Sequence, residues 1–464
     1  MNARYQKHDS SQESSLLIEK SENTIKKLKE FSASQEYSGF GWRWKDLGLL
    51  IVVLLLQGGA VCVESFLYPL LPEVALKIGL TQTYIGVVFS AYEVGRFLTS
   101  AAVGSLVSKT TPKIMLILGG ALSSVSSFLI GLFYYVDDGL FFSLNVMARL
   151  ISGCGMSMVT VSGLSLLLKA TEFQTGTVLV IVEGILGCAY SFGVAAGIFL
   201  NDLVGYSFTC YIFGGFMGVL MIIQIAVVPN IEETGNKSSK GFFQLMKVPG
   251  QVLLFFHCFT NTLCMTSRLV SLPSFLMTTF GVSSSDIGSF LGVANFIYLL
   301  FSPLCGFLIN KLTYTLILIA WLIQSLLLLF MGPSPLLDFI FHGKKYYLGT
   351  VITWCTIQLS QVCVFLAPFK ASLNLAEATG YERDSVHTYG MIAGMVNCAQ
   401  GLGSIAGPVG GGAIYEVLGF PWLVTIFGFL QFSLATVTII YLITMRLANK
   451  PLTPEQADEI RFRK

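Results

Sequence analysis

Long uninterrupted apolar runs divide this chain, and they constrain its fold more than any other feature. A helix needs about 20 apolar residues to cross the hydrocarbon core of a membrane, whereas the strands of a membrane β-barrel alternate in polarity. The runs here are continuous, so they predict membrane-spanning helices and exclude a barrel. We predict twelve spans, at residues 47–71, 83–107, 113–136, 142–168, 176–204, 206–229, 250–280, 284–309, 313–332, 346–372, 386–418 and 420–446.

The composition excludes the main alternatives to a membrane protein. Only 12% of the 464 residues are charged and 54% are apolar, whereas a soluble domain has about 25% charged residues. This chain therefore cannot cover the surface of a soluble enzyme. Its 36 Phe and 18 Tyr supply too much apolar burial for a disordered protein. The formal net charge of +2 gives no reason to expect a nucleic-acid partner.

The spans form two sets of six, and the positions of the basic residues predict their orientation. Lys and Arg gather on the cytosolic side of membrane proteins. With both ends on one side, 22 of the 28 Lys and Arg fall on that side, three on the other and three within spans. Both termini are therefore predicted to be cytosolic. The predicted parts are a disordered tail (1–45), a six-helix bundle (46–229), a cytosolic linker (230–249), a second six-helix bundle (250–447) and a tail (448–464).

Two matched segments indicate an internal repeat. Residues 85–109 resemble residues 287–311 at a constant separation of 202, and the fifth and eleventh spans share glycines at a separation of 214. A longer loop at 333–345 absorbs the difference of 12 residues. Two like-oriented halves are expected to hold a binding site between them, near the membrane midplane. The matched pairs are Gly104 with Gly306, Lys109 with Lys311, Gly193 with Gly407, and Gly197 with Gly411.

The loop after the second span resembles the signature loop of the major facilitator superfamily. That family has a Gly-x-Leu-x-Asp-Arg-x-Gly-Arg-Lys run, and here the loop reads GSLVSKTTPK from Gly104 to Lys113. Ser108 stands at the acidic position and Thr111 at the central glycine. A degenerate echo, GFLINK, runs from Gly306 to Lys311.

Two further motifs resemble the same family. Arg149 begins an Arg-x-x-x-Gly-x-Gly pattern like that of proton-coupled members, in which the arginine is implicated in proton coupling. GSIAGPVGG, from Gly403 to Gly411 and followed by Gly412, fits the antiporter signature, although the family normally carries it in the fifth span and here it lies in the eleventh. The resemblance implies an all-α membrane protein with twelve transmembrane helices in two pseudo-symmetric six-helix bundles. It also implies a transporter and not an enzyme, with no cofactor.

Within the superfamily the chain is similar to the vesicular amine transporters, and most to their polyamine-transporter branch. Residues 406–428 carry this similarity, together with residues 68–77, where Pro69 and Pro72 are expected to end the first span. The resemblance implies exchange of an amine or polyamine for protons, in a vesicle, endosomal or plasma membrane. A loose acidic dileucine pattern at residues 13–17 suits vesicle sorting.

Charged side chains within the spans are the candidate substrate and proton sites. A charge at a helix centre costs about 2.5–3.5 kcal/mol on insertion scales, so it needs a partner or a cavity. Glu93 and Arg96 lie three residues apart, and a static ion pair is the alternative to a role in the site. Glu64 is expected either to bind a cation or to pair with Arg149.

The repeat aligns Glu183 with Asn397 of the other half, and Glu183 is expected to face the cavity. Burial disfavours the charged form of a carboxylate, so such a group holds a proton or an organic cation, and competition between them is a basis for exchange. Arg268 lies nearer a span end and is expected either to extend toward the interface or to contact the opposite half. The candidate site residues are Glu64, Glu93, Arg96, Arg149, Glu183 and Asn397.

The glycines of the fifth and eleventh spans have two possible roles. Glycines at four-residue spacing permit close helix packing, and Pro408 removes a backbone donor and loosens its helix. Static packing and a bending point during transport both remain open. The residues concerned are Gly193, Gly197, Gly403, Gly407, Pro408, Gly411 and Gly412.

Other functions are constrained by what the sequence lacks. The ten cysteines lie in apolar stretches without CxxC spacing, so we expect packing residues and no metal site. The alternative to amine exchange is a carrier of the same superfamily for another substrate class, such as drugs, organic anions or lipids. We expect a monomer whose partners are the bilayer, a small-molecule substrate and protons.

Overall fold

Helices build the described part of the chain. The computed structural model describes residues 44–77, 82–170, 175–229, 241–282, 284–342, 345–383, 385–454 and 456, and none of these forms a strand. The helices are α2 (Trp44–Ser65), α3 (Leu67–Lys77), α4 (Gln82–Thr110), α5 (Pro112–Phe133), α6 (Asp138–Ala170), α7 (Thr175–Val204), α8 (Tyr206–Val227), α9 (Phe242–Leu245), α10 (Pro249–Phe280), α11 (Ser284–Met331), the 3-10 helix η1 (Pro335–Leu337), α12 (Asp338–Phe341), α13 (Tyr347–Ala378), α14 (Val386–Leu418) and α15 (Phe420–Leu447).

Each predicted span coincides with a helix, and the predicted all-α membrane fold is confirmed. The eighth and ninth spans lie in the single 48-residue helix α11, which is kinked at Leu312, where the backbone angles are non-helical (φ −129°, ψ 37°). Among the described residues, eight helical stretches are long and apolar enough to cross a membrane. The helices α4, α10 and α14 are not among these eight. These three helices are therefore less apolar than the eight stretches. Two of them, α4 and α14, pack against each other.

The first span does not end at its prolines, contrary to the sequence-based expectation. The helix breaks at Phe66, between α2 and α3, and then continues past Pro69 and Pro72 to Lys77. Pro69 lacks the N–H that the carbonyl of Ser65 would accept in a continuous helix, so the break lies one turn before the proline. This break places Glu64 in the last turn of α2.

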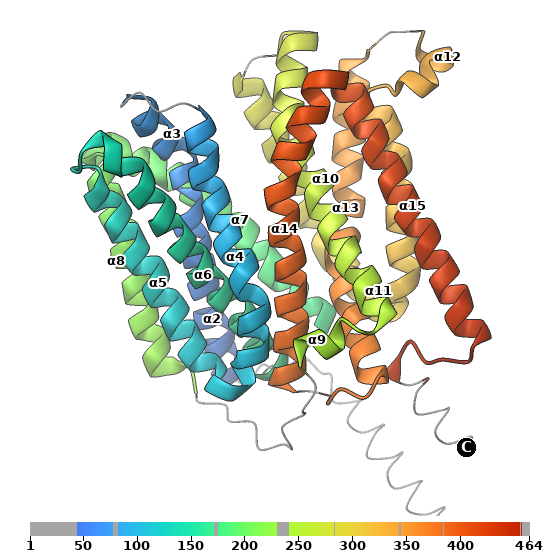
Figure 1. Ribbon diagram of the computed structural model, residues 1–464, viewed down its shortest axis with the longest axis horizontal. Coiled ribbons are helices and arrows are strands. Elements are labelled where there is room, and N and C mark those ends of the chain that lie inside the picture. Colours follow the sequence, from blue (N-terminus) through green and yellow to red (C-terminus); the bar gives the residue numbers. More distant parts are fainter. Residues whose placement is uncertain are drawn as a thin grey trace, which may run out of the picture. The chain divides into compact units, whose positions relative to one another are not determined.

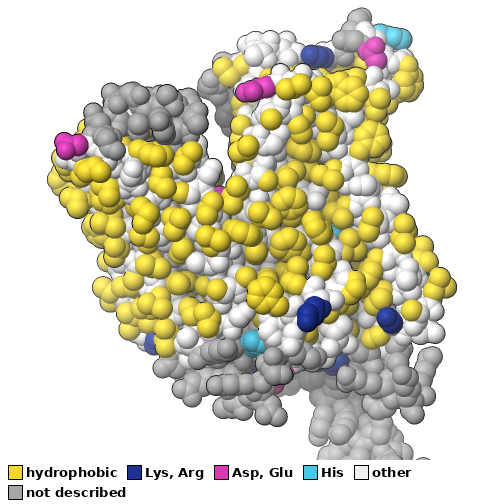
Figure 2. All heavy atoms as spheres, viewed as in Figure 1, with side chains coloured by type: hydrophobic (Ala, Val, Ile, Leu, Met, Phe, Trp, Pro, Cys, Tyr) yellow, Lys and Arg dark blue, Asp and Glu magenta, His cyan; other side chains and the backbone are white. Residues whose placement is uncertain are grey.

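Within the unit formed by Leu49–Lys464, the helices pack in two groups (Figure 1). In the first group α4 and α5 pack along α6, and α8 packs along α5. In the second group α13 and α15 pack along α11, and α10 packs along α14. Figure 2 shows apolar side chains across the middle of one face, with charged side chains toward its two ends. A belt of exposed apolar side chains suits contact with lipid hydrocarbon, where polar groups are costly.

Two glycine contacts join the groups. A Cβ on Gly104 of α4 would lie 2.5 Å from the carbonyl oxygen of Gly390 of α14, and a Cβ on Gly176 of α7 would lie 2.5 Å from that of Gly306 of α11. Only glycine permits so close an approach. The repeat relates the two contacts, because 306 − 104 = 202 and 390 − 176 = 214.

Asn310 adds hydrogen bonds to the second contact. Its Oδ1 accepts from the backbone N–H of Gly176 at 3.1 Å, and its Nδ2 donates to the carbonyl of Gly306 at 3.1 Å. The N–H groups of the first turn of a helix have no partner inside the helix, so this side chain satisfies one of them. The repeat-related residue of the first half is Ser108, because 310 − 108 = 202. Its side chain lies outside the described residues.

Several predictions from the sequence fall on residues that the structure does not describe. They are the tail up to residue 43 with the dileucine pattern, residues 230–240 of the linker, the last residues 457–464 and the side chain of Lys109. Of the other signature lysines, Lys311 lies with its Nζ 4.6 Å from the ring centroid of Phe307. Lys113 accepts a hydrogen bond through its carbonyl from Gln224 at 3.3 Å.

Thr111, at the position where the family signature has glycine, adopts a backbone conformation that favours glycine. Its φ of 71° and ψ of 142° precede the first residue of α5, and a positive φ is unfavourable for a residue with a branched Cβ. We expect Thr111→Gly to raise the free energy of unfolding by about 1 kcal/mol, because it removes this strain. Thermal unfolding of the purified protein in detergent measures the change.

Thr110→Gly is the matched control. Thr110 is the last helical residue of α4, so glycine there is expected to lower stability by roughly 0.5–1 kcal/mol. A Thr111→Gly variant that loses stability like the control would show that the backbone at residue 111 is not strained.

Candidate functional site

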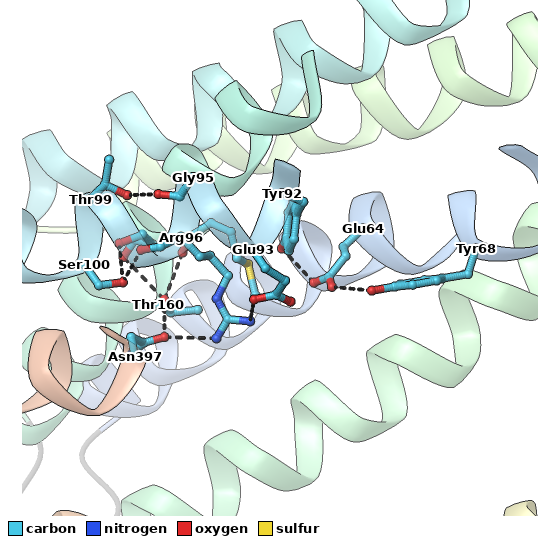
Figure 3. Close-up of polar contacts among 12 residues, drawn as sticks. Glu64, Tyr68, Tyr92, Glu93, Gly95, Arg96, Thr99, Ser100, Thr160 and Asn397 are labelled. Carbon is cyan, nitrogen blue, oxygen red and sulfur yellow. Dashed lines mark hydrogen bonds and ion pairs between the residues drawn. The ribbon is translucent and has the colours of Figure 1, made fainter. Parts of the chain in front are cut away.

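Glu64 lies among tyrosines near the end of α2. Its side chain is buried, with Oε2 accepting from the hydroxyl of Tyr92 at 2.7 Å and Oε1 accepting from the hydroxyl of Tyr68 at 3.2 Å. Tyr68 stacks on Phe89 with ring centroids 4.8 Å apart and lies 5.9 Å from the ring of Tyr190. Figure 3 shows the two tyrosines on either side of the carboxylate. Four aromatic rings therefore gather around one acidic group.

Arg149 of α6 is fully buried beside this cluster. Its guanidinium carbon lies 4.6 Å from the ring centroid of Tyr92 and 5.2 Å from that of Phe89. Its three guanidinium nitrogens have no hydrogen-bond partner among the described residues. Glu64 and Arg149 therefore form no ion pair. Tyr92 contacts both residues, through its hydroxyl and its ring face.

The glycine of the arginine motif explains why Arg149 lies so close to α4. A Cβ on Gly153 would lie 2.0 Å from the carbonyl oxygen of Tyr92, and one on Gly155 would lie 2.8 Å from that of Gly119 on α5. Gly153 thus lets α6 approach α4, and Gly155 lets it approach α5. The motif therefore has a packing role in this chain as well as the role that the resemblance implies for its arginine.

Arg96 connects the two groups of helices. Its Nη1 lies 3.5 Å from Oε2 of Glu93, and its Nη2 donates to Oδ1 of Asn397 on α14 at 3.3 Å. Thr160 of α6 donates to the same Oδ1 at 3.4 Å, as Figure 3 shows. Glu93 and Arg96 are thus an ion pair on one helix, as the spacing allowed, and the pair also extends to the opposite group.

Glu183 of α7 is half-buried and receives no hydrogen bond from any residue that the structure describes. Leu299 is the neighbour of the adjacent Gly184, with a carbon 3.2 Å from where a Cβ would lie. Glu183 therefore lies where α7 meets the second group of helices.

The repeat relates polar residues at the two places where the groups of helices meet. Arg96 corresponds to Tyr298, because 298 − 96 = 202, and Glu183 corresponds to Asn397, because 397 − 183 = 214. Arg96 of α4 donates to Asn397 of α14, and the repeat-related residues Tyr298 and Glu183 lie on α11 and α7, which pack against each other. The basic residue, Arg96, is aligned with a tyrosine, and the acidic residue, Glu183, is aligned with an asparagine.

The glycines of α7 and α14 pack within their own groups. On α7, Gly193 faces Cys62 and Gly197 faces Phe66, both on the first span. Gly403, Gly407 and Gly411 face α10, and Ser267 of α10 donates to the carbonyl of Gly407 at 2.6 Å. Pro408 lies inside α14 next to this bond. Gly412 would have no neighbour within 4 Å of an added Cβ, so it is not part of the packed face.

Some residues of the site were not identified from the sequence. Thr160, whose hydroxyl donates to the same Asn397 oxygen as Arg96, could not be identified from the sequence, because hydroxyl residues are common in these spans. Tyr68 was noted only for the segment that it begins. Gly176 and Gly390 have the same separation of 214 as the glycine pairs that were noticed, so the repeat could have identified them. Among the described residues no group of three or more His, Cys, Asp or Glu could hold a metal ion.

The fold and the site together define a multi-pass helical membrane protein of the carrier class, with its charged residues where two helical groups meet. A sequence model described as the Major Facilitator Superfamily matches residues 53–378. The chain belongs to that superfamily, and it is therefore a membrane transporter for a small molecule and not an enzyme.

Similar proteins include vesicular amine transporters. The MFS-type transporter SLC18B1 of Mus musculus is 27% identical over 384 residues, which cover 82% of each chain. The synaptic vesicular amine transporter of Homo sapiens is 24% identical over 362 residues, or 76% of this chain and 65% of that protein. The crystal structure of the human organic anion transporter MFSD10 (TETRAN) has a TM-score of 0.61 at 14% identity, covering 85% of this chain and 99% of that one. This last likeness shows the fold alone.

Removal of Arg96 is expected to destabilise the protein through Glu93. Both side chains are largely buried, at 16% and 14% exposed, so Arg96→Gln leaves a carboxylate without its counter-charge. We expect a loss of about 2 kcal/mol in the free energy of unfolding. The double variant Glu93→Gln/Arg96→Gln removes both charges and should recover most of that loss, as thermal unfolding would show. Equal loss in the single and double variants would mean that the ion pair does not matter for stability.

Proposed function

We propose that this chain is a secondary transporter that exchanges a small organic cation, an amine or polyamine, for protons by alternating access. The observation that carries the proposal is the carboxylate of Glu183, to which no described residue donates a hydrogen bond. An ionisable group of this kind within a membrane is unfavourable unless it has a ligand or a functional partner. A proton and an organic cation both neutralise a carboxylate, and each excludes the other.

The surroundings of Glu64 favour an organic ammonium as the second occupant. Ring faces attract cations, with gains that grow as the cation loses water. Tyr68, Phe89, Tyr92 and Tyr190 supply such rings around an acidic group. A hydrophilic inorganic cation would gain little from them, whereas an alkyl or aryl ammonium gains from both rings and charge.

Similar proteins support the same substrate class. The matches at 24% identity include proteins named as chromaffin granule and synaptic vesicular amine transporters. Two carboxylates without a basic ion-pair partner, Glu64 and Glu183, suit a cationic substrate. A carrier for organic anions, drugs or lipids is the competing assignment, and uptake measurements separate the two.

Alternating access requires that the contacts between the groups break. The two glycine contacts, Gly104–Gly390 and Gly176–Gly306, lie near the end of α4, the start of α7 and the start of α14. These helix ends face the same side as both termini in the predicted topology. We therefore propose that the two glycine contacts form a closed gate on the cytosolic side. The proposed location of the protein is a vesicle, endosomal or plasma membrane.

Uptake into proteoliposomes with an imposed pH gradient tests the proposed exchange. Purified protein is reconstituted, and radiolabelled amines, polyamines, organic anions and neutral drugs are offered outside vesicles with an acidic interior. We expect accumulation of an amine or polyamine that collapses when a protonophore removes the gradient, because outward proton flow drives uptake. Uptake of a cation that is indifferent to the gradient would contradict the exchange mechanism. Accumulation of an anion alone would contradict the substrate class.

Glu183→Gln tests the proposed proton site. The amide keeps the size of the side chain but neither gains nor loses a proton near neutral pH, so gradient-driven uptake should be abolished while expression and thermal stability stay near those of the parent. Glu416→Gln is the matched control, since Glu416 is exposed near the end of α14, and it should transport normally. Normal gradient-driven uptake by Glu183→Gln would place the proton site elsewhere.

A further inference from the structure

A guanidinium without a counter-charge lies inside the second group of helices. Arg268 of α10 is 1% exposed and lies 12 residues before the helix end (280 − 268), about 18 Å along the axis. The side chain therefore does not reach the membrane interface. The expectation that it extends toward the interface is wrong. Its Nε donates to the carbonyl of Cys264 on its own helix at 3.0 Å. Its Nη1 is buried without a hydrogen-bond partner among the described residues.

The other two buried arginines have carboxylates nearby, and Arg268 does not. Arg96 forms an ion pair with Glu93, and Arg149 lies over the ring of Tyr92, whose hydroxyl donates to Glu64. No described acidic residue lies within ion-pair distance of Arg268. Arg268 and Arg149 thus both lack a described ion-pair partner, and Arg268 differs in that no described carboxylate is bound to the aromatic ring beside it.

Trp354 of α13 supplies a second unused donor beside Arg268. The guanidinium carbon lies 5.7 Å from the centroid of the Trp354 ring, and the indole Nε1 is also buried without a partner among the described residues. A guanidinium and an indole N–H are both donors only. The occupant that satisfies both must accept hydrogen bonds, and the charge of Arg268 selects an anion.

We propose that Arg268 and Trp354 form an anion-binding site within the second group of helices, separate from the cation site of Glu64 and Glu183. The site takes a small monovalent anion, either a halide or a carboxylate group. Water would satisfy the donors but leave the charge uncompensated in a medium of low dielectric constant. An organic ammonium is repelled by the same charge. The proposal does not depend on the proposed amine exchange, because it concerns binding and not transport.

Thermal unfolding of the full-length protein in detergent measures this binding. The unfolding midpoint is followed at constant ionic strength while sodium gluconate, whose anion is too bulky for a buried site, is replaced by sodium chloride, bromide or acetate. A ligand that binds only the folded state raises the midpoint in a saturable way. A rise with chloride and bromide identifies an inorganic anion as the ligand, and a rise with acetate alone identifies a carboxylate.

Variants assign the effect to the site. Arg268→Gln should show no dependence on the anion, and Trp354→Phe, which keeps the ring and loses the N–H, should need about tenfold more anion for half of the effect. Arg446→Gln is the control for weak surface binding, because Arg446 is exposed at the end of α15, and it should respond like the parent. If Arg268→Gln does not fold, the Trp354→Phe shift decides. A parent midpoint that ignores every anion, or variants that respond like the parent, would overturn the proposal.

Discussion

The close approach of helix backbones between the two groups is the constraint on which the site depends. The backbone of α4 at Gly104 lies so close to the backbone of Gly390 that no side chain fits between them. Gly176 and Gly306 make a contact of the same kind. In lipid there is little hydrophobic drive for helix association, so contact of small residues supplies much of the packing energy. At larger separations the 3.3 Å hydrogen bond between Arg96 and Asn397 could not form.

Charge is distributed unevenly over the two repeat-related halves. In the first half the Glu93–Arg96 pair contacts the second group through Asn397, whereas Glu64 and Arg149 lie among aromatic rings within the first group. At the related positions of α11 and α14 the second half has Tyr298 and Asn397, which are neutral. The second half therefore offers hydrogen-bonding surfaces to whatever the first half binds by charge.

The sequence predicted the helices well, because most of the spans are continuous apolar runs of about the length that crosses the hydrocarbon core. The break before Pro69 was misplaced, because a proline disrupts the turn that precedes it, and the run itself continues through it. The repeat assigned Glu183 and Asn397 to equivalent positions of the two halves, but the side chains that each of them contacts were not predictable from the sequence. Glu64 accepts a hydrogen bond from Tyr92 and forms no ion pair with Arg149. Gly153 lets α6 pack closely against α4, and such distances follow from three-dimensional packing alone.

The gate and the site are on the same pairs of rigid helices, so neither can move alone. On α4, Gly104 and Arg96 are eight residues apart, and on α14, Gly390 and Asn397 are seven apart, which is about 10–12 Å along either axis. When α4 and α14 separate at the glycines, a straight helix of that length carries Arg96 away from Asn397 as well. The same spacing joins Gly306 to Tyr298 and Gly176 to Glu183 on the other pair. In the proposed transport cycle, opening of this gate takes Asn397 away from Arg96 and so changes the surroundings of the Glu93–Arg96 ion pair.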